Sequence, residues 1–218
     1  MSFIDYLNEA KTPKKFKPKD HWELSELVCD TSVYLGDIDT SLITNMSHSS
    51  IGSIFEGCQR KDWSGIETWD VSNVKRMSWL FHRIDFNEDI SKWDVSNVER
   101  MDRMFKDCSF NGNISKWDVS KVKDMEAMFQ GSKFNGDISK WNTKNVERMT
   151  SMFADSKFNR DISKWNVSKV ESMSWMFYDC PFNHDISKWD VSKVRTNSSM
   201  INGCPIKHEY LPPRFLDD

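Results

Sequence analysis

The sequence predicts an α/β solenoid with turns of 24 residues, and two observations support this prediction. Tryptophans recur at a constant spacing of 24 residues, at Trp69, Trp93, Trp117, Trp141, Trp165 and Trp189. The stretch 89–101, which reads DISKWDVSNVERM, returns with little change around each of them. A unit of this size cannot bury its own apolar face, so successive units bury it against one another.

The first half of each unit predicts a short parallel strand. In the unit around Trp93, the apolar residues of 90–98 follow the order L-x-x-L-x-L, which is the strand pattern of a leucine-rich-type repeat. Trp93 and Val95 are two residues apart and share one strand face, while Lys92, Asp94 and Ser96 share the other.

The second half predicts a short helix. Val98, Met101, Met104, Phe105 and Cys108 have helical spacing. Ser96 and Glu99 have the spacing of a capping box, which places the helix start at the serine. Phe110 and Asn111 then turn the chain back. We expect the tryptophan, phenylalanine and methionine columns to form the core rather than a cofactor site.

The repeat resembles the 24–25-residue repeat of BspA-like leucine-rich surface proteins, which is also found in mycoplasma lipoproteins and phages. The motif FNxDISxWDVSxVxxMxxMF is seen at 86–105, 110–129, 134–153, 158–177 and, in part, 182–201. This resemblance implies a right-handed α/β solenoid with a binding role and no chemistry attached to the repeat.

The first ten residues lie outside the repeat and resemble the capsid-targeting peptide of internal proteins of T-even-type phages. Phe3, Asp5 and Tyr6 fill three places of that pattern, and Leu7, Glu9 and Ala10 complete it. Leu7-Asn8-Glu9 also matches the site cut by the prohead protease of such phages, which implies processing before Ala10. The alternative is an ordinary amphipathic helix.

The remaining segments divide the chain in order. Residues 11–20 hold five lysines and two prolines, which predicts a basic, flexible linker; the alternative is an arm that contacts nucleic acid through Lys11–Lys19. Residues 21–35 predict a helical N-terminal cap, 36–202 the solenoid and 203–218 a C-terminal cap. The first solenoid unit is a degenerate copy of the repeat. Its Asp39 and Met46 align with Asp70 and Met77, which follow 31 residues later instead of 24.

Cysteine usage and hydropathy predict a reducing compartment and no membrane span. Cys108 and Cys180 are three turns apart, roughly 15 Å at strand spacing, which is too far for a disulfide. We expect buried free thiols. The N-terminus has no apolar segment of a secretion signal, and no run approaches the roughly 18 apolar residues of a membrane span.

Few residues have the spacing that catalysis or metal binding needs. The five histidines share no column, and no phosphate-binding loop is present. Aspartates do form a column, at Asp70, Asp94, Asp118 and Asp190, and this column could bind Ca²⁺. A lysine column two residues earlier favours a charge-compensated surface instead. We therefore expect no enzyme activity, no cofactor and no metal.

A candidate binding surface lies where the units differ. Two columns of the predicted helix vary from unit to unit, and their large side chains at the two ends of the solenoid are typical interface anchors. The candidates are Trp79, His82, Arg83, Arg103, Trp175 and Tyr178. The alternative is neutral drift at exposed positions.

Together these observations predict a non-enzymatic solenoid that binds a protein partner, either a capsid protein or a host protein. The N-terminal peptide implies a place in the phage virion interior or, after delivery, in the host cytoplasm. The alternative function is a surface-displayed adhesin or host-attachment module, which the bacterial relatives suggest.

Overall fold

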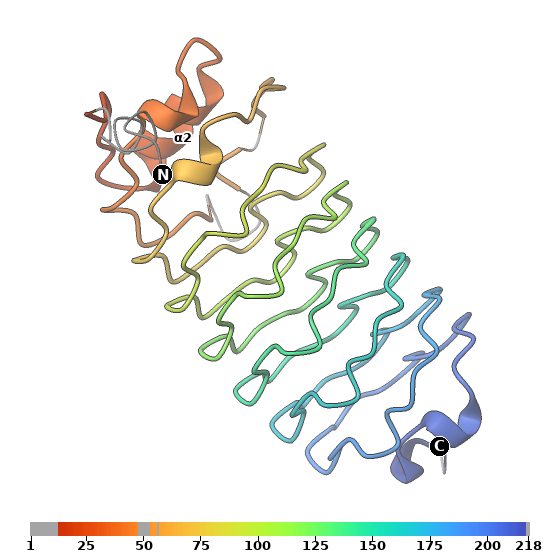
Figure 1. Ribbon diagram of the computed structural model, residues 1–218. Helices are drawn as coiled ribbons and strands as arrows, with labels where there is room; N and C mark the ends of the chain where they lie inside the picture. The colour runs from red at the N-terminus through yellow and green to blue at the C-terminus, as the bar shows by residue number, and fades with distance from the viewer. Residues whose placement is uncertain (1–12, 48–52, 56, 217–218) are drawn as a thin grey trace, which may run out of the picture.

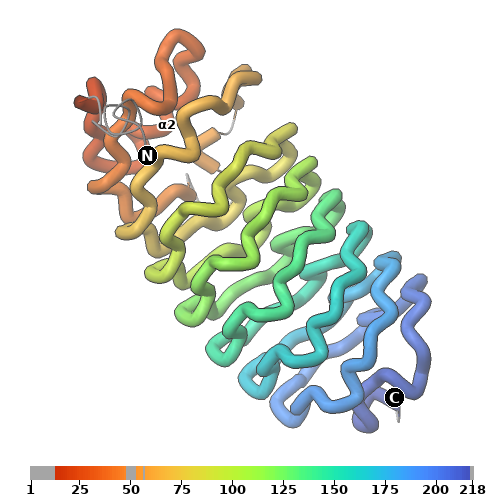
Figure 2. The backbone as a smooth tube through the Cα atoms, in the orientation of Figure 1, coloured from red at the N-terminus to blue at the C-terminus, as the bar shows by residue number. Residues whose placement is uncertain are grey.

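The computed structural model describes residues 13–47, 53–55 and 57–216, and it shows the repeat units side by side in chain order. The first and the last parts of the described chain lie at opposite ends of this stack (Figures 1 and 2). The predicted processing site at Leu7, Glu9 and Ala10, and Lys11 of the predicted linker, lie outside the described residues.

Regular secondary structure is confined to the ends of the stack and its first units. Helix α2 spans His21–Cys29, and four short 3-10 helices, η1 to η4, span Leu35–Asp37, Ile66–Thr68, His208–Tyr210 and Pro213–Phe215. Within the described residues, the units from residue 70 to residue 203 contain neither an α-helix nor a strand longer than a single bridge. The predicted short helices are therefore wrong.

The segment predicted as a helix carries the hydrogen bonds between units. Parallel bridges join one residue per unit: Asn45 to Arg76, Arg76 to Arg100, Arg100 to Asp124, Asp124 to Arg148, Arg148 to Ser172 and Ser172 to Thr196. Beyond each bridge, alternate backbone N–H groups donate to the next unit. Trp79 donates to the carbonyl of Asp102 at 2.9 Å, and Phe81 donates to that of Met104 at 2.8 Å.

Left-handed residues explain why this segment does not form a helix. One column has positive φ in every regular unit: Trp79 (65°), Arg103 (57°), Ala127 (52°), Ser151 (54°), Trp175 (62°) and Ser199 (53°). A second column, which includes Arg83 and Gly131, does the same four residues later. A right-handed helix cannot continue through such residues. The apolar spacing that resembles a helix thus comes from a chain that turns twice per segment.

The segment predicted as a strand has the expected alternation but not the expected pairing. Trp93 and Val95 are buried, while Lys92 and Asp94 are exposed. However, the N–H of Trp93 donates to Ile90 at 3.1 Å, which closes a local turn instead of a bridge. The capping box is also wrong, because the N–H of Ser96 donates to the carboxylate of Asp94 at 3.0 Å and forms an Asx turn.

Aromatic columns form the core, as the sequence predicts. The rings of Phe81 and Phe105 stack with centroids 5.5 Å apart, and those of Phe86 and Phe110 lie 6.0 Å apart. The indole N–H of Trp93 donates to the carbonyl of Ile66, in the preceding unit, at 3.1 Å. Each fully buried phenylalanine contributes about 1.5–3 kcal/mol. The stack is therefore stabilised mainly through these columns.

The N-terminal end is covered by residues 13–47. Asp20 caps α2 by accepting from the N–H groups of Trp22 and Glu23, and the helix buries Leu24 and Val28. The segment from residue 13 to residue 20 differs from the flexible linker we expected: Phe16 forms a parallel bridge with Ile38, and Lys15 forms an ion pair with Asp37 at 2.7 Å. The predicted offset of 31 residues in the first unit is confirmed by the bridge from Asn45 to Arg76.

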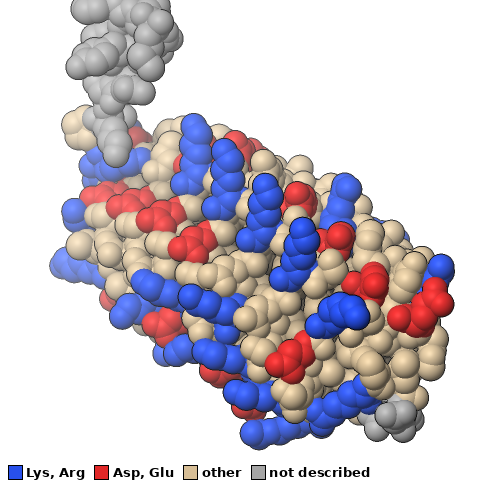
Figure 3. Space-filling view, turned by 60° about the horizontal axis from the view of Figure 1, so that its bottom comes forward, with Lys and Arg blue, Asp and Glu red and all other residues tan. Residues whose placement is uncertain are grey.

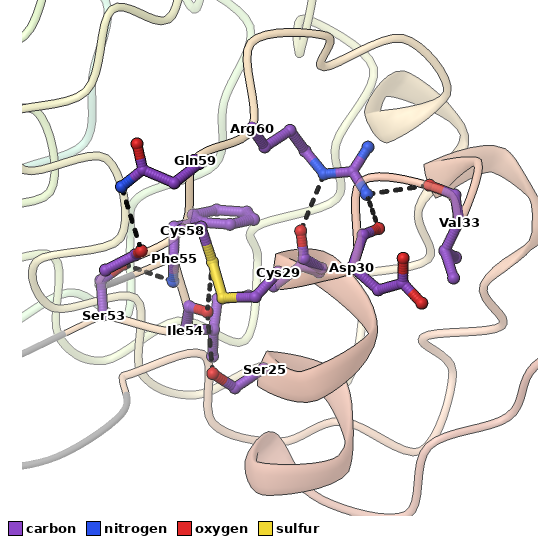
Figure 4. The surroundings of a disulfide bond; sticks show 12 residues. Ser25, Cys29, Asp30, Val33, Ser53, Ile54, Phe55, Cys58, Gln59 and Arg60 are labelled. Carbon is purple, nitrogen blue, oxygen red and sulfur yellow. Dashed lines mark hydrogen bonds between the residues drawn. A yellow bond between two sulfur atoms is a disulfide. The ribbon is translucent and has the colours of Figure 1, made fainter.

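A disulfide and a buried arginine fasten this end. Cys29 at the end of α2 is bonded to Cys58, with their Cα atoms 4.7 Å apart (Figure 4). For this pair the prediction of free thiols is wrong, because the loop of the irregular first unit brings Cys58 to the helix. Arg60 donates to the carbonyls of Val28 and Val33 at 2.7 and 2.8 Å, and also to that of Asp30. The carbonyl of Val28 lies in the last turn of α2, where it lacks a helical partner, and those of Asp30 and Val33 lie in the loop that follows, so Arg60 joins the helix to this loop.

Candidate functional site

The outward side chains of the hydrogen-bonded segments form one continuous surface, which we call the ladder face. In each segment the methionines and the phenylalanine point into the core, as Met173, Met176 and Phe177 do, and the residues between them point outward. The ladder face contains every residue predicted as a partner anchor, in the segments 76–83, 100–107 and 172–179.

The N-terminal half of the ladder face, residues 76–148, is held by charged side chains. Asp124 is 2% exposed and accepts from Arg100 at 3.1 Å and from Arg148 at 2.6 Å. Asp102 is equally buried and accepts from the hydroxyl of Ser78 at 2.6 Å and from Arg100 at 3.0 Å. We call this region the charged half.

Trp79 packs against side chains of the charged half. The guanidinium of Arg103 lies 4.9 Å from the Trp79 ring centroid, which is cation–π distance. The ring of His82 meets the same indole edge-on at 4.8 Å, and Arg103 is itself paired with Glu126. Arg83 lies 3.7 Å from Asp107 and is largely exposed.

The C-terminal half of the ladder face, residues 150–199, carries fewer charges, with Asp155 and Asp179 exposed at the far ends of their segments. Hydroxyl groups replace the charges: Ser172 lies 2.6 Å from Thr150 and 2.8 Å from Thr196. Trp175 is 46% exposed, and its ring packs against Tyr178 with centroids 5.0 Å apart. We call this region the hydroxyl half.

The structure thus brings the predicted anchors together as two clusters instead of one surface. Trp79, His82 and Arg103 contact one another, and Trp175 contacts Tyr178 four units further along the stack. Sequence reasoning placed both tryptophans in one exposed column. It missed the buried carboxylates of Asp102 and Asp124, which occupy positions that are Ser or Thr in the last two units.

The aspartate column serves turn structure. The hydroxyl and the backbone N–H of Ser96 hold the pKa of Asp94 below its usual range, and Ser120 does the same for Asp118. Asn142 and Asn166 accept equivalent N–H bonds without a charge. Throughout the residues that the structure describes, no group of three or more His, Cys, Asp or Glu side chains could hold a metal ion.

Charge on the stack is mixed in sign. On the face shown in Figure 3, basic and acidic side chains lie interspersed along the units. In the predicted basic linker, Lys15 and Lys17 pair with Asp37 and Asp39 at 2.7 and 2.8 Å. These two lysines are therefore occupied by carboxylates of the chain itself.

The three remaining cysteines are free, as the sequence predicts for Cys108 and Cys180. Burial raises the pKa of both these thiols to about 11, so they are protonated and unreactive at neutral pH. Cys204 is only partly buried. Among the described residues, no helix is long and apolar enough to cross a membrane.

The fold and the ladder face define a repeat protein with 24-residue units, few regular elements and a core of buried aromatic columns. The sequence matches the family described as Mycoplasma protein of unknown function, DUF285, over three overlapping stretches, 23–131, 49–155 and 109–211. The chain belongs to this repeat family, and the predicted resemblance is confirmed in this form. No curated protein and no solved structure matches the chain.

Proposed function

We propose that the protein is a non-enzymatic solenoid that binds a protein partner through the hydroxyl half of its ladder face. The observation that carries this proposal is the Trp175–Tyr178 pair. A 46% exposed tryptophan, packed on a tyrosine and surrounded by small hydroxyl side chains, has the chemistry of an interface anchor. The charged half lacks this property because Arg103 covers Trp79.

Several features support this assignment over an enzymatic one. The buried thiols have raised pKa values, the aspartates are engaged in Asx turns, and the variable side chains lie on an open surface. Recognition through a row of repeat units is the usual activity of solenoid proteins. We further propose the right-handed winding that the BspA-like resemblance implies.

The experiment is site-specific photocrosslinking. A photoreactive phenylalanine analogue at position 175 is expected to capture a discrete partner from infected or host cells, and excess unmodified chain should compete. The Trp175→Ala chain should compete at least about tenfold less well, since an anchor tryptophan contributes ~2 kcal/mol or more. The matched control carries the analogue at Leu42, which is 49% exposed at the other end of the stack. Equal capture at both positions would refute the proposal.

For the biological setting, we propose a phage head. The support is the resemblance of residues 1–10 to a capsid-targeting peptide, with Leu7 and Glu9 before the cut and Ala10 after it. In this setting the protein would meet capsid proteins or, once delivered, a host protein in the cytoplasm. Intact mass of the protein from purified particles is the test: a chain beginning at Ala10 supports the proposal, and absence from particles contradicts it.

The disulfide favours a second candidate function, that of a surface-displayed attachment module. Stable disulfides are typical of proteins outside the reducing cytoplasm. The bond between Cys29 and Cys58 is therefore more consistent with display on the cell surface than with a location in the cytoplasm. Labelling of intact cells with a membrane-impermeant biotin reagent separates the two settings: display predicts labelling of the chain, and a packaged protein remains unlabelled.

A further inference from the structure

The last unit of the stack leaves a row of hydrogen-bond donors unpaired. In the unit before it, the N–H groups of Trp175, Phe177 and Asp179 donate to the carbonyls of Ser198, Met200 and Asn202 at 2.8 to 3.0 Å. The equivalent donors of the last unit belong to Ser199, Ile201 and Gly203. Among the described residues, these three N–H groups have no acceptor.

This edge presents donors without acceptors. The carbonyls of Ser199 and Ile201 accept from Asn202 and Cys204 within the same unit, so they are already used in local turns. An ordinary edge strand offers both N–H and C=O groups. Two copies of this edge therefore cannot satisfy each other. The matching surface must present a row of acceptors.

A groove runs along the same edge. It has a volume of about 480 Å³ and lies between residues 197–202 on one side and Leu211 and Phe215 of the C-terminal cap on the other. The sequence explains the space: Ile201 stands in the column that holds Phe177, and Asn197 stands in the column that holds Met173. The smaller side chains of the last unit leave room above the core.

We propose that this groove is a docking site for an extended segment of a partner protein, which lays backbone carbonyl groups on Ser199, Ile201 and Gly203 and an apolar side chain against Leu211 and Phe215. The repeat itself shows the kind of occupant that fits. In the described units from Trp79 onward, each earlier edge of this type is covered by such a segment, as residues 124–131 cover the donors of Arg103, Phe105 and Asp107 at 2.7 to 2.9 Å. Addition of a strand to an open edge is an established mode of peptide recognition.

The lining of the groove favours a neutral peptide. Its residues are Asn, Ser, Met, Ile, Leu and Phe, with no charged side chain among them. The unpaired N–H groups alone could also attract an anion, since successive N–H groups near left-handed residues form anion sites. The apolar side chains of Leu211 and Phe215 make no favourable contact with an anion, whereas an apolar side chain of a peptide can pack against them.

The test is amide NMR of the full chain with a capped synthetic peptide that has the sequence of residues 196–202, an uncharged segment that covers the donors of Trp175, Phe177 and Asp179. We expect saturable shifts at Ser199, Ile201 and Gly203, and none at Trp175, Phe177 and Asp179, whose N–H groups are already bonded. Ile201→Pro, which removes the central donor, should weaken binding at least about tenfold, or ~1.4 kcal/mol. Ile201→Ala retains the N–H and is the matched control.

Four outcomes would overturn the proposal. They are the absence of saturable binding at millimolar peptide, shifts confined to other units, equal shifts produced by inorganic phosphate alone, and protection of the same three amides by self-association without peptide. If Ile201→Pro fails to fold, the location of the shifts in the native chain still decides the matter. The result is independent of the function proposed for Trp175, because a Trp175→Ala chain should bind the peptide unchanged.

Discussion

The two halves of the ladder face share one backbone and differ in how they hold their side chains. Trp79 and Trp175 occupy the same column, with φ of 65° and 62°. The residue that follows Trp79 in the column is Arg103, which lies on its ring, whereas Trp175 is flanked by Ser151 and Ser199. The repeat therefore fixes where a side chain leaves the backbone, while the side chains of the neighbouring units decide whether it stays exposed.

The largest expected difference concerns Asp124 in the charged half. Asp124→Ala should lower the free energy of unfolding by about 2 kcal/mol, because it removes the buried acceptor of two arginines; their partial exposure keeps the loss below the 3–5 kcal/mol of a fully buried pair. The matched change in the hydroxyl half, Ser172→Ala, should cost about 0.5–1 kcal/mol. Urea denaturation measures both. Equal losses would show that the charges add no stability.

The next largest difference in the free energy of unfolding is expected between alanine variants of the two tryptophans. Trp79→Ala removes the indole that Arg103 and His82 contact and should cost about 1 kcal/mol or somewhat more. Trp175→Ala removes a half-exposed side chain and should change the free energy of unfolding by about 0.5 kcal/mol or less. Thermal unfolding of the two variants in parallel gives the comparison. A larger loss for Trp175→Ala would mean that its ring serves the fold instead of a partner.

A smaller effect is expected from the left-handed positions between the two tryptophans. Ser151 has a φ of 54°, and its side chain is only partly buried. Ser151→Gly should therefore raise the free energy of unfolding by about 0.5–1 kcal/mol, because glycine adopts this conformation without strain. Ser174→Gly, next to a left-handed residue but not itself one, is the control and should destabilise the chain.

The smallest expected effect is a difference in acid sensitivity. Ser96 and Ser120 hold the pKa values of Asp94 and Asp118 below the usual range, so the stability these turns add is present above about pH 4 and is lost as the pH falls through the lowered values. Asn142 and Asn166 hold the same turns without titrating. The double variant Asp94→Asn, Asp118→Asn should therefore unfold at a slightly lower pH than the native chain, as followed by tryptophan fluorescence. An unchanged midpoint would contradict this account.

The sequence predicts the repeat period, the core columns and the N-terminal helix, because these depend on apolar spacing alone. It misplaces the hydrogen-bonded segment. Met101, Met104, Phe105 and Cys108 have helical spacing, and nothing in the side chains of Arg103 or Ala127 signals a left-handed backbone, a conformation usually associated with glycine and asparagine. The inter-unit bonds outweigh this local cost, and only the assembled stack reveals them.

The candidate site is predicted in part for a similar reason. Variation between units marks the ladder face correctly, but exposure depends on which side chains meet across neighbouring units, as Arg103 meets Trp79. The bond between Cys29 and Cys58 also escapes prediction, because Cys29 lies in the cap helix and Cys58 in the irregular first unit, where the repeat gives no register. Arg60 stands in the small insertion that breaks the period there.

The serial arrangement of units has a mechanical consequence. Each unit is held by its neighbours, so a force applied to the C-terminal end should peel units away one at a time, each releasing about 80 Å of chain for its 24 residues. The bond between Cys29 and Cys58 closes the other end into a loop that force cannot extend without reduction. Under force applied to both ends, the units should therefore unfold in order from the C-terminal end towards the disulfide-closed N-terminal end.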